Sequence, residues 1–280
     1  MEIADVDRAK HALGHISYYR LRAYWLYFEA DPESGLHTFK PGTTLEAVLT
    51  LYEFDRHLRL ILMDALERIE VAARGSWAYQ LAMVYGPHGY LDAALYPRAD
   101  RFQENVDQLQ SEYDRSHDVF VDHYKRSYND PPLPPVWMAA EFMSFGLLSK
   151  FFSALGGRAD RKAIARKIGF DDRVFQGLMH HLATVRNICA HHSRLWNRRF
   201  TVTFPMAQNP PALAATIDPQ ADRKLYNTLS MLLHSMAVVA PESDWPKRLA
   251  ALIEENPSGD FEAMGFPPDW RERPLWAAIL

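Results

Sequence analysis

One stretch of the sequence, VRNICAHHSRLWNRRF at residues 185–200, gathers the side chains best suited to chemistry. It holds two adjacent histidines, four arginines and two asparagines, and no Asp, Glu or Lys lies between Arg173 and Arg199. Imidazole exchanges protons near neutral pH, and guanidinium binds anions through paired hydrogen bonds. The stretch therefore indicates a site that binds an anion and moves protons.

We expect residues 172–197 to form one helix that positions these groups, with Asp171 or Asp172 at its start. At about 100° per residue, side chains three or four positions apart share a face. The predicted buried stripe consists of Phe175, Leu178, Leu182, Val185, Cys189, His192 and Trp196. The predicted polar stripe on the opposite side consists of His180, Thr184, Asn187, His191, Arg194 and Arg198.

Arg186 does not belong to that polar stripe. On a straight helix it lies about 100° from Asn187 and about 140° from His191, so one helix cannot direct Arg186 and His191 at the same atom. Either the helix kinks there, or the pair acts together with the same pair from a second copy across a two-fold axis. The small side chains of Ala183 and Ala190 would let another helix approach closely. This geometry favours a composite site in a homodimer.

Helical periodicity dominates the remaining sequence and predicts an all-α fold. A capping box of Thr43 and Glu46 predicts the start of a long helix that runs to about Tyr85. Further helices are expected at residues 5–28, 100–128, 137–154 and 223–239. We expect a helical domain at residues 1–200, which carries the motif helix, and a C-terminal helical extension at residues 201–280 packed on the same core.

The composition excludes several classes of protein. A chain of 280 residues, 48% hydrophobic and 24% charged, can bury one substantial core or two modest ones. The longest apolar runs fall short of the ~20 residues of a membrane span, and the N-terminus does not resemble a signal peptide, which favours a soluble cytoplasmic protein without membrane contacts. Cys189 is the single cysteine, which excludes an intrachain disulfide and a cysteine-based zinc site.

The net charge of −4 argues against broad coating of nucleic acid but allows a local basic patch. The most basic window is RADRKAIARK, from Arg158 to Lys167. It is either a solvated helix face or a phosphate-binding surface. Its candidate binding residues are Arg158, Arg161, Lys162, Arg166 and Lys167.

Residues 186–191 read R-N-x-x-x-H, which resembles the R-x4-6-H signature of HEPN-domain ribonucleases. Longer stretches are together similar to the Abi family, the AbiD/AbiF-like abortive-infection proteins of bacteria, over nearly the whole chain. These stretches are HISYYRLRAYWLYF, FKPGTTLEAVLTLYEFDRHLR through ALERIEVAAR, PPVWMAAEFMSFGLLSKFF, VRNICAHHSRLWNR and MGFPPDW. The resemblance implies a HEPN-like helical bundle with additional helices, a homodimer in which two motif helices meet, and metal-independent RNA cleavage or RNA binding in defence against phage.

The chemistry of the residues is compatible with that implication. RNA carries its own nucleophile, the 2′-OH, so an enzyme needs a proton acceptor, a donor for the leaving oxygen and positive charge at the phosphate. His191 would move the proton, Arg186 would hold the phosphate, and Asn187 would orient the imidazole or the phosphate. The expected products are a 2′,3′-cyclic phosphate and a 5′-hydroxyl, with no cofactor. The candidate RNA contacts are Arg194, Arg198, Arg199 and His180, with the Arg158–Lys167 window.

Several of these residues have structural alternatives. His192 fits a hydrogen-bonded core histidine, His180 and His181 are ambiguous, and the arginines after the motif could cap the helix C-terminus. His11 and His15 have the spacing of a metal pair but lack a third ligand, which favours a structural role. Five charged residues of the long helix fit either surface or inter-helix ion pairs, as for Glu70 with Arg74, or a supporting role beneath the motif helix. They are Asp55, Arg59, Glu67, Glu70 and Arg74.

Two functions from different classes follow. The first is a dimeric, toxin-like endoribonuclease that halts growth of infected cells. The second is a module that binds one particular RNA and cleaves it weakly or not at all, with a small noncoding RNA or an antitoxin as partner. A zinc hydrolase is disfavoured because the sequence has no H-E-x-x-H or comparable ligand set.

Overall fold

The computed structural model describes residues 1–280 and confirms the all-α prediction. Eleven α-helices have seven residues or more. The structure has no β-sheet, and its only β-type pairing is two isolated β-bridges. The helices are α1 (Val6–Ile16), α2 (Tyr18–Trp25), α3 (Leu45–Tyr85), α4 (Ala99–Arg115), α5 (Val119–Ser127), α6 (Val136–Phe142), α7 (Phe145–Ala154), α8 (Arg158–Arg166), α9 (Asp172–Ala190), α10 (Pro211–Thr216), α11 (Leu225–Val239), α12 (Trp245–Glu254) and α13 (Pro274–Ala277). No helix has both the length and the apolar character needed to cross a membrane.

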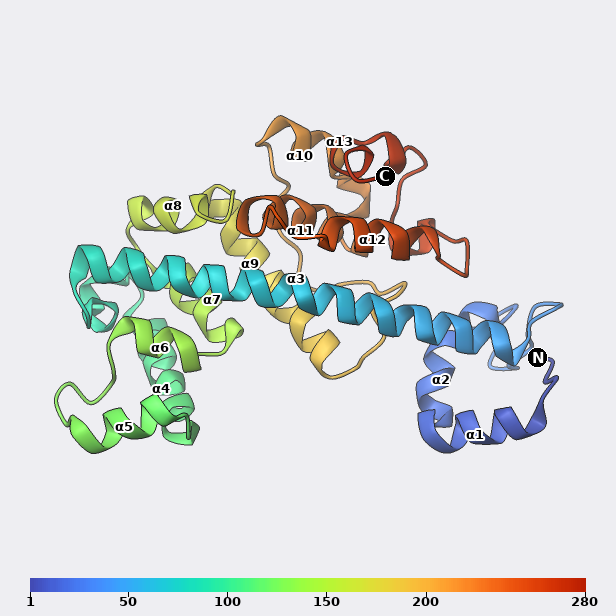
Figure 1. Cartoon of the computed structure of the whole chain (residues 1–280), viewed down its shortest axis with the longest axis horizontal. Coiled ribbons are helices and arrows are strands. Elements are labelled where there is room, and N and C mark those ends of the chain that lie inside the picture. The colour runs from blue at the N-terminus through green and yellow to red at the C-terminus, as the bar shows by residue number, and fades with distance from the viewer.

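The helix α3 is the axis of the molecule. Its 41 residues correspond to about 60 Å, and Figure 1 shows it spanning most of the longest dimension. The helices α2, α6, α8, α9, α11 and α12 all pack against it. Its end at Tyr85 was predicted, but its N-cap is Thr44, whose hydroxyl accepts the Ala47 N–H. The predicted capping box is therefore wrong by one residue, and Glu46 pairs instead with Arg8 at 2.8 Å.

Three segments predicted as single helices are each divided in two. Ser17 adopts a φ of 70° between α1 and α2, and residues 116–118 separate α4 from α5. Ser144 divides α6 from α7 because its hydroxyl caps α7 by accepting the Leu147 N–H. The apolar periodicity continues across these short breaks, so periodicity alone did not reveal them.

The helix α9 starts where the sequence predicts. The carboxylate of Asp171 accepts the N–H groups of Arg173 and Val174 and so caps the helix. The predicted apolar stripe is buried from Phe175 to Cys189, against α3, α7 and α8. The helix ends at Ala190, because His192 adopts a φ of 56°. The prediction of a continuous helix to residue 197 is therefore wrong.

The residues after position 200 share the core with the earlier helices. The helices α11 and α12 lie along α3, as Figure 1 shows, and the indole N–H of Trp245 donates to the Ile61 carbonyl at 2.6 Å. Trp270 and Trp276 are also buried. Buried residues from Ala9 to Trp276 form one hydrophobic cluster, so the two segments are joined by apolar contact as well as by the chain.

His181 is a core residue that ties α9 to α11. Its Nδ1 lies 2.7 Å from the Val202 carbonyl oxygen and its Nε2 lies 2.8 Å from the Thr228 hydroxyl. A neutral ring satisfies both contacts, because Nδ1–H donates to the carbonyl and Nε2 accepts from the hydroxyl. Burial lowers the pKa of His181 from 6.5 to about 4. This histidine is structural, whereas the adjacent His180 is exposed.

This burial makes stability depend on pH in a defined window. Because the unfolded state binds a proton more readily, the contribution is fully present above about pH 6.5 and is lost as pH falls toward about 4. We expect the free energy of unfolding to drop by about 2 kcal/mol from pH 7 to pH 5 on account of this group. Urea denaturation at both pH values measures it. His181→Gln should lose most of this difference and His180→Gln should keep it; equal slopes in all three proteins would contradict the assignment.

Candidate functional site

A turn of residues 191–197, which we call the motif turn, follows α9 and folds back onto α3. It is held by the carboxylate of Asp55, which is fully buried. Asp55 accepts the backbone N–H of Leu195 at 3.0 Å and that of Trp196 at 2.6 Å. It also accepts the hydroxyl of Tyr24 at 2.6 Å and a hydrogen bond from Arg59. One buried carboxylate thus joins α2, α3 and the motif turn.

The surroundings of Asp55 shift its pKa in two opposite directions. Burial raises the pKa of the Asp55 carboxyl, and the hydrogen bonds from Tyr24, Arg59 and the two backbone amides oppose that rise. The sequence left Asp55 and Arg59 open between ion pairs and a supporting role beneath the motif helix. Both are buried, because α2 and the motif turn cover this part of α3.

Two arginines exchange hydrogen bonds between α2 and the motif turn. Arg20 Nη1 donates to the His192 carbonyl at 2.6 Å, and Arg194 Nη1 donates to the Ala23 carbonyl at 2.8 Å. Arg198 Nη1 in turn donates to the Arg194 carbonyl at 3.0 Å. Arg194 and Arg198 therefore do not extend a helical polar stripe, because the helix has already ended. Their guanidinium groups are partly buried, and each is bonded to a main-chain carbonyl.

The two histidines of the motif both face solvent. The backbone N–H of His191 donates the last hydrogen bond of α9 to the Asn187 carbonyl at 2.9 Å, and the side chain of His191 is exposed. His192 is exposed as well, so the prediction of a core histidine is wrong. The positive φ turns it away from the buried stripe. Asn187 and Arg199 are also exposed.

Arg186 belongs to a cluster with two residues of α3, which we call the Glu70 cluster. Glu70 Oε2 lies 3.7 Å from Arg186 Nε, and Glu70 Oε1 lies 2.5 Å from Arg74 Nη2. The side chain of Glu70 is 8% exposed, that of Arg74 18% and that of Arg186 39%. Glu70 is therefore buried and Arg74 is partly buried. Of the five charged residues that could have supported the motif helix, Glu67 alone is fully exposed.

Within one chain, Arg186 and His191 are not joined. Arg186 Nη1 lies 3.4 Å from Asn187 Oδ1, but no hydrogen bond or ion pair links the imidazole of His191 to either side chain. Ala183 is 5% exposed, so the prediction that it is open to a helix of a second copy is wrong, while Ala190 is exposed. Ala183 is covered by neighbouring helices of the same chain.

The basic window forms α8, and its cations differ in their partners. Arg158 and Arg161 lie 3.4 Å and 3.9 Å from the largely buried carboxylate of Asp172, and Arg161 also donates to the carbonyls of Leu155 and Gly156. Lys162, Arg166 and Lys167 are exposed and form no ion pair. These three cations are free to meet an anion.

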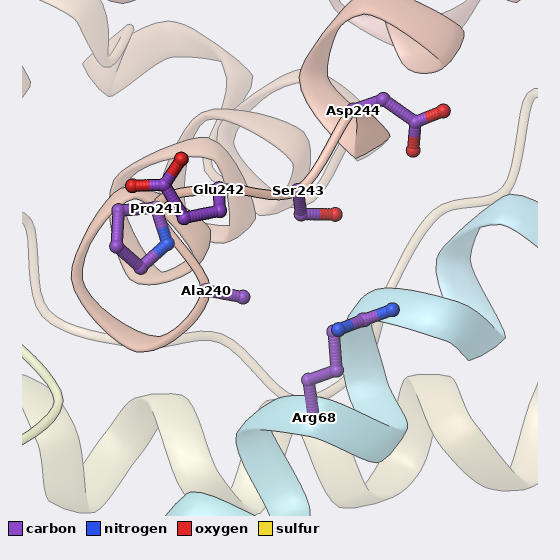
Figure 2. Close-up of a pocket in the computed structure, with 6 residues that line it drawn as sticks. All are labelled: Arg68, Ala240, Pro241, Glu242, Ser243 and Asp244. Carbon is purple, nitrogen blue, oxygen red and sulfur yellow. The ribbon is translucent and has the colours of Figure 1, made fainter.

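The structure contains no group of three or more His, Cys, Asp or Glu side chains arranged to hold a metal ion. The rings of His11 and His15 stack at 4.3 Å, and His15 Nδ1 lies 2.9 Å from the His11 carbonyl oxygen. A surface depression between α3 and the loop before α12 (Figure 2) contains none of the predicted site residues. It is lined by Arg68, Ala240, Pro241, Glu242, Ser243 and Asp244.

Comparison with known proteins identifies the family. A model of the Abi-like protein family matches residues 11–197. The chain belongs to the Abi-like protein family. Membership implies a role in abortive infection, a bacterial defence against phage. The match covers α2, α3, α9 and the whole motif turn, which are the elements that build the candidate site of this Abi-like protein. Neither a curated protein nor a solved structure matches the chain.

Sequence reasoning missed two residues that position the motif turn of this Abi-like protein, Tyr24 and Arg20. It also left Asp55 undecided. A signal was present, because Asp55 continues the spacing of Leu51, Leu58 and Leu62 and so lies in the buried register of the long helix. An acidic residue in such a register needs several donors, and it indicates a polar contact inside the core.

Removing the Asp55 carboxylate should destabilise the protein strongly. Asp55→Ala leaves Arg59 without its anion and frees the amides of Leu195 and Trp196, so we expect a loss of about 3–5 kcal/mol in the free energy of unfolding. Urea denaturation measures the loss. Glu46→Gln, which breaks an exposed ion pair with Arg8, should leave the midpoint almost unchanged. A loss from Asp55→Ala no larger than that from Glu46→Gln would refute the anchoring role.

Proposed function

We propose that this Abi-like protein is a metal-independent endoribonuclease of the HEPN type, toxin-like in its effect on the infected cell. One observation carries the proposal. An exposed imidazole, His191, and a restrained guanidinium, Arg186, lie at the end of one helix whose continuation is anchored by a buried carboxylate. In the proposed site both groups are presented to substrate from a rigid support.

The proposed reaction uses the 2′-OH of RNA as nucleophile. His191 accepts the 2′-OH proton or donates a proton to the leaving 5′-oxygen, since imidazole can do either near neutral pH. Arg186 holds the non-bridging phosphate oxygens and stabilises the charge that develops on them. Asn187 lies beside Arg186 and supplies an amide that orients the phosphate or the imidazole. The products are a 2′,3′-cyclic phosphate and a 5′-hydroxyl, and the reaction needs no cofactor.

We propose a homodimer as the active form. In a single chain no hydrogen bond or ion pair joins the side chains of His191 and Arg186. A second copy related by a two-fold axis could place its own Arg186 or His191 next to the pair of the first. The exposed Ala190 leaves room for such an approach at the end of α9. In this arrangement residues 1–200 form the nuclease domain, and residues 201–280 are an extension that buttresses it.

The RNA backbone would follow cations around the motif. Arg199 and His180 are exposed, as are Lys162, Arg166 and Lys167 on α8. Arg158 and Arg161 contribute less freely because Asp172 lies within 4 Å of both. Arg194 and Arg198 would present their remaining N–H groups while holding the motif turn. Such contacts predict RNA affinity that falls steeply with salt.

The alternative is an RNA-binding protein with weak or absent catalysis, whose partner is a small noncoding RNA or an antitoxin. The observation that favours it is the separation of Arg186 from His191 within the chain. The two functions make different demands on His191. Cleavage requires its imidazole, whereas binding alone depends on the arginines and lysines.

The deciding experiment incubates the purified protein with labelled cellular RNA in EDTA at moderate salt and identifies the product ends. We expect cyclic-phosphate ends from the wild type, with His191→Ala slower by about 10²-fold or more because proton transfer is lost. Arg186→Ala should also be inactive. His192→Asn is the matched control, since asparagine tolerates the positive φ at that position, and it should cleave at the wild-type rate.

The other outcomes are equally informative. RNA retention without cleavage, lost in Arg186→Ala and kept in His191→Ala, would replace the nuclease by the binding protein. Cleavage that persists in His191→Ala would remove the proposed site. Cleavage abolished by EDTA would exclude the metal-independent mechanism.

A further inference from the structure

The Glu70 cluster places a largely buried carboxylate directly against the proposed phosphate-binding arginine. Glu70 projects from the middle of α3, and its two oxygens serve two different guanidinium groups, Arg74 on the same helix and Arg186 on α9. Burying a carboxylate is costly unless donors surround it. Glu70 is unexpected at this position. Its carboxylate competes with the phosphate of the proposed site for the guanidinium of Arg186.

We propose that Glu70 is the positioning residue for Arg186, and that Arg74 balances the charge of Glu70 so that Arg186 stays available to phosphate. This inference rests on the proposed function, because it concerns the same phosphate-binding site. It assigns roles to two residues that do not themselves contact the reacting atoms.

The orientation of Arg186 follows from which nitrogen Glu70 faces. Glu70 Oε2 lies nearest to Arg186 Nε, at 3.7 Å, and Asn187 Oδ1 lies 3.4 Å from Nη1. The Nη2 end of the guanidinium is then left for an incoming anion, with the second N–H of Nη1 beside it. A phosphate accepts two parallel N–H groups from such an end. Fixing the guanidinium in advance saves the conformational entropy of a long side chain that is otherwise 39% exposed.

The charge balance depends on Arg74. If Glu70 faced Arg186 alone, the two charges would cancel. Arg74 Nη2 lies 2.5 Å from Glu70, so two cations share one carboxylate and the cluster keeps a net charge of +1. Arg74 has no other carboxylate partner; its Nη2 also donates to the Met143 carbonyl at 2.9 Å, and its Nε is buried without a hydrogen bond. Arg74 is thus held in place with Glu70 as its single anion.

The substitution Glu70→Gln distinguishes the positioning of Arg186 from a role of Glu70 in folding alone. The substitution keeps the shape of the side chain and removes one negative charge beside Arg186. We expect unchanged or tighter RNA binding, together with single-turnover cleavage slowed by about tenfold because Arg186 is less well oriented. A residue needed only for folding would lower affinity, cleavage rate and melting temperature together.

Arg74→Gln tests the charge balance. It leaves Glu70 to neutralise Arg186 alone, so RNA affinity should fall by about fivefold to tenfold, as for the loss of a phosphate contact. The double variant Glu70→Gln with Arg74→Gln should regain affinity close to the wild type, since Arg186 no longer faces a carboxylate. Glu67→Gln is the control: Glu67 lies on the same helix, is exposed and forms no ion pair, so affinity and rate should stay unchanged.

Affinity is measured by fluorescence anisotropy with a fluorescein-labelled single-stranded RNA of mixed sequence, fully 2′-O-methylated to prevent cleavage. Rates are measured on the unmodified RNA, and melting temperatures confirm that each variant is folded.

Three results would each overturn the inference. They are a wild-type cleavage rate in Glu70→Gln, a parallel loss of affinity and stability in Glu70→Gln, and wild-type affinity in Arg74→Gln. If the wild type binds RNA without cleaving it, the nuclease proposal fails, while the affinities of the two single variants and the double variant still decide the charge balance. A wild type that neither binds nor cleaves would overturn both.

Discussion

The carboxylate of Asp55 is the interaction on which the geometry of the site depends. It accepts two consecutive main-chain amides, those of Leu195 and Trp196, just where α9 has ended and the chain reverses. Consecutive amides in such a turn would otherwise be buried without partners. The same carboxylate receives Tyr24 and Arg59, so the position of the turn is fixed relative to α2 and α3 at once. The side chain of His191 is exposed, while the backbone N–H groups of His191, His192 and Ser193 are all hydrogen-bonded.

A single helix supports both halves of the site. Asp55 holds the motif turn, and Glu70 holds Arg186, and both project from α3 about 22 Å apart along its axis. Arg186 lies on α9 beside Glu70, and the chain then leaves α9 at Ala190 and reaches Asp55 through the motif turn. Because α3 is continuous and packs against seven other helices, the two supports are held at a fixed separation. Such fixed geometry suits the proposed nuclease site, whose chemistry would rest on orientation.

Much of this architecture could be predicted from sequence. The end of α9 and the supports of the site on α3 could not, for one shared reason. The ends of α3 and the start of α9 follow from local signals, a threonine before an apolar run and Asp171 before an amphipathic one. The end of α9 does not, because Leu195 and Trp196 continue the apolar spacing although the chain has left the helix. They are buried by folding back onto a carboxylate 140 and 141 residues earlier, which local periodicity cannot register. In the same way, the sequence singles out Arg186, Asn187 and His191, but their supports on α3 emerge only from the packing of distant segments.

The contact between α2 and the motif turn uses side chains on one side and main-chain oxygens on the other. Arg20 donates to the carbonyl of His192, and Arg194 donates to the carbonyl of Ala23. Every residue type carries a carbonyl, so positions 23 and 192 are free to change during evolution without breaking this joint, within the limits set by packing and by the positive φ of residue 192. The arginines have no such freedom, because lysine offers neither the reach nor the flat fork of donors. At this contact we therefore expect Arg20 and Arg194 to stay constant among related sequences, while the residues at positions 23 and 192 vary.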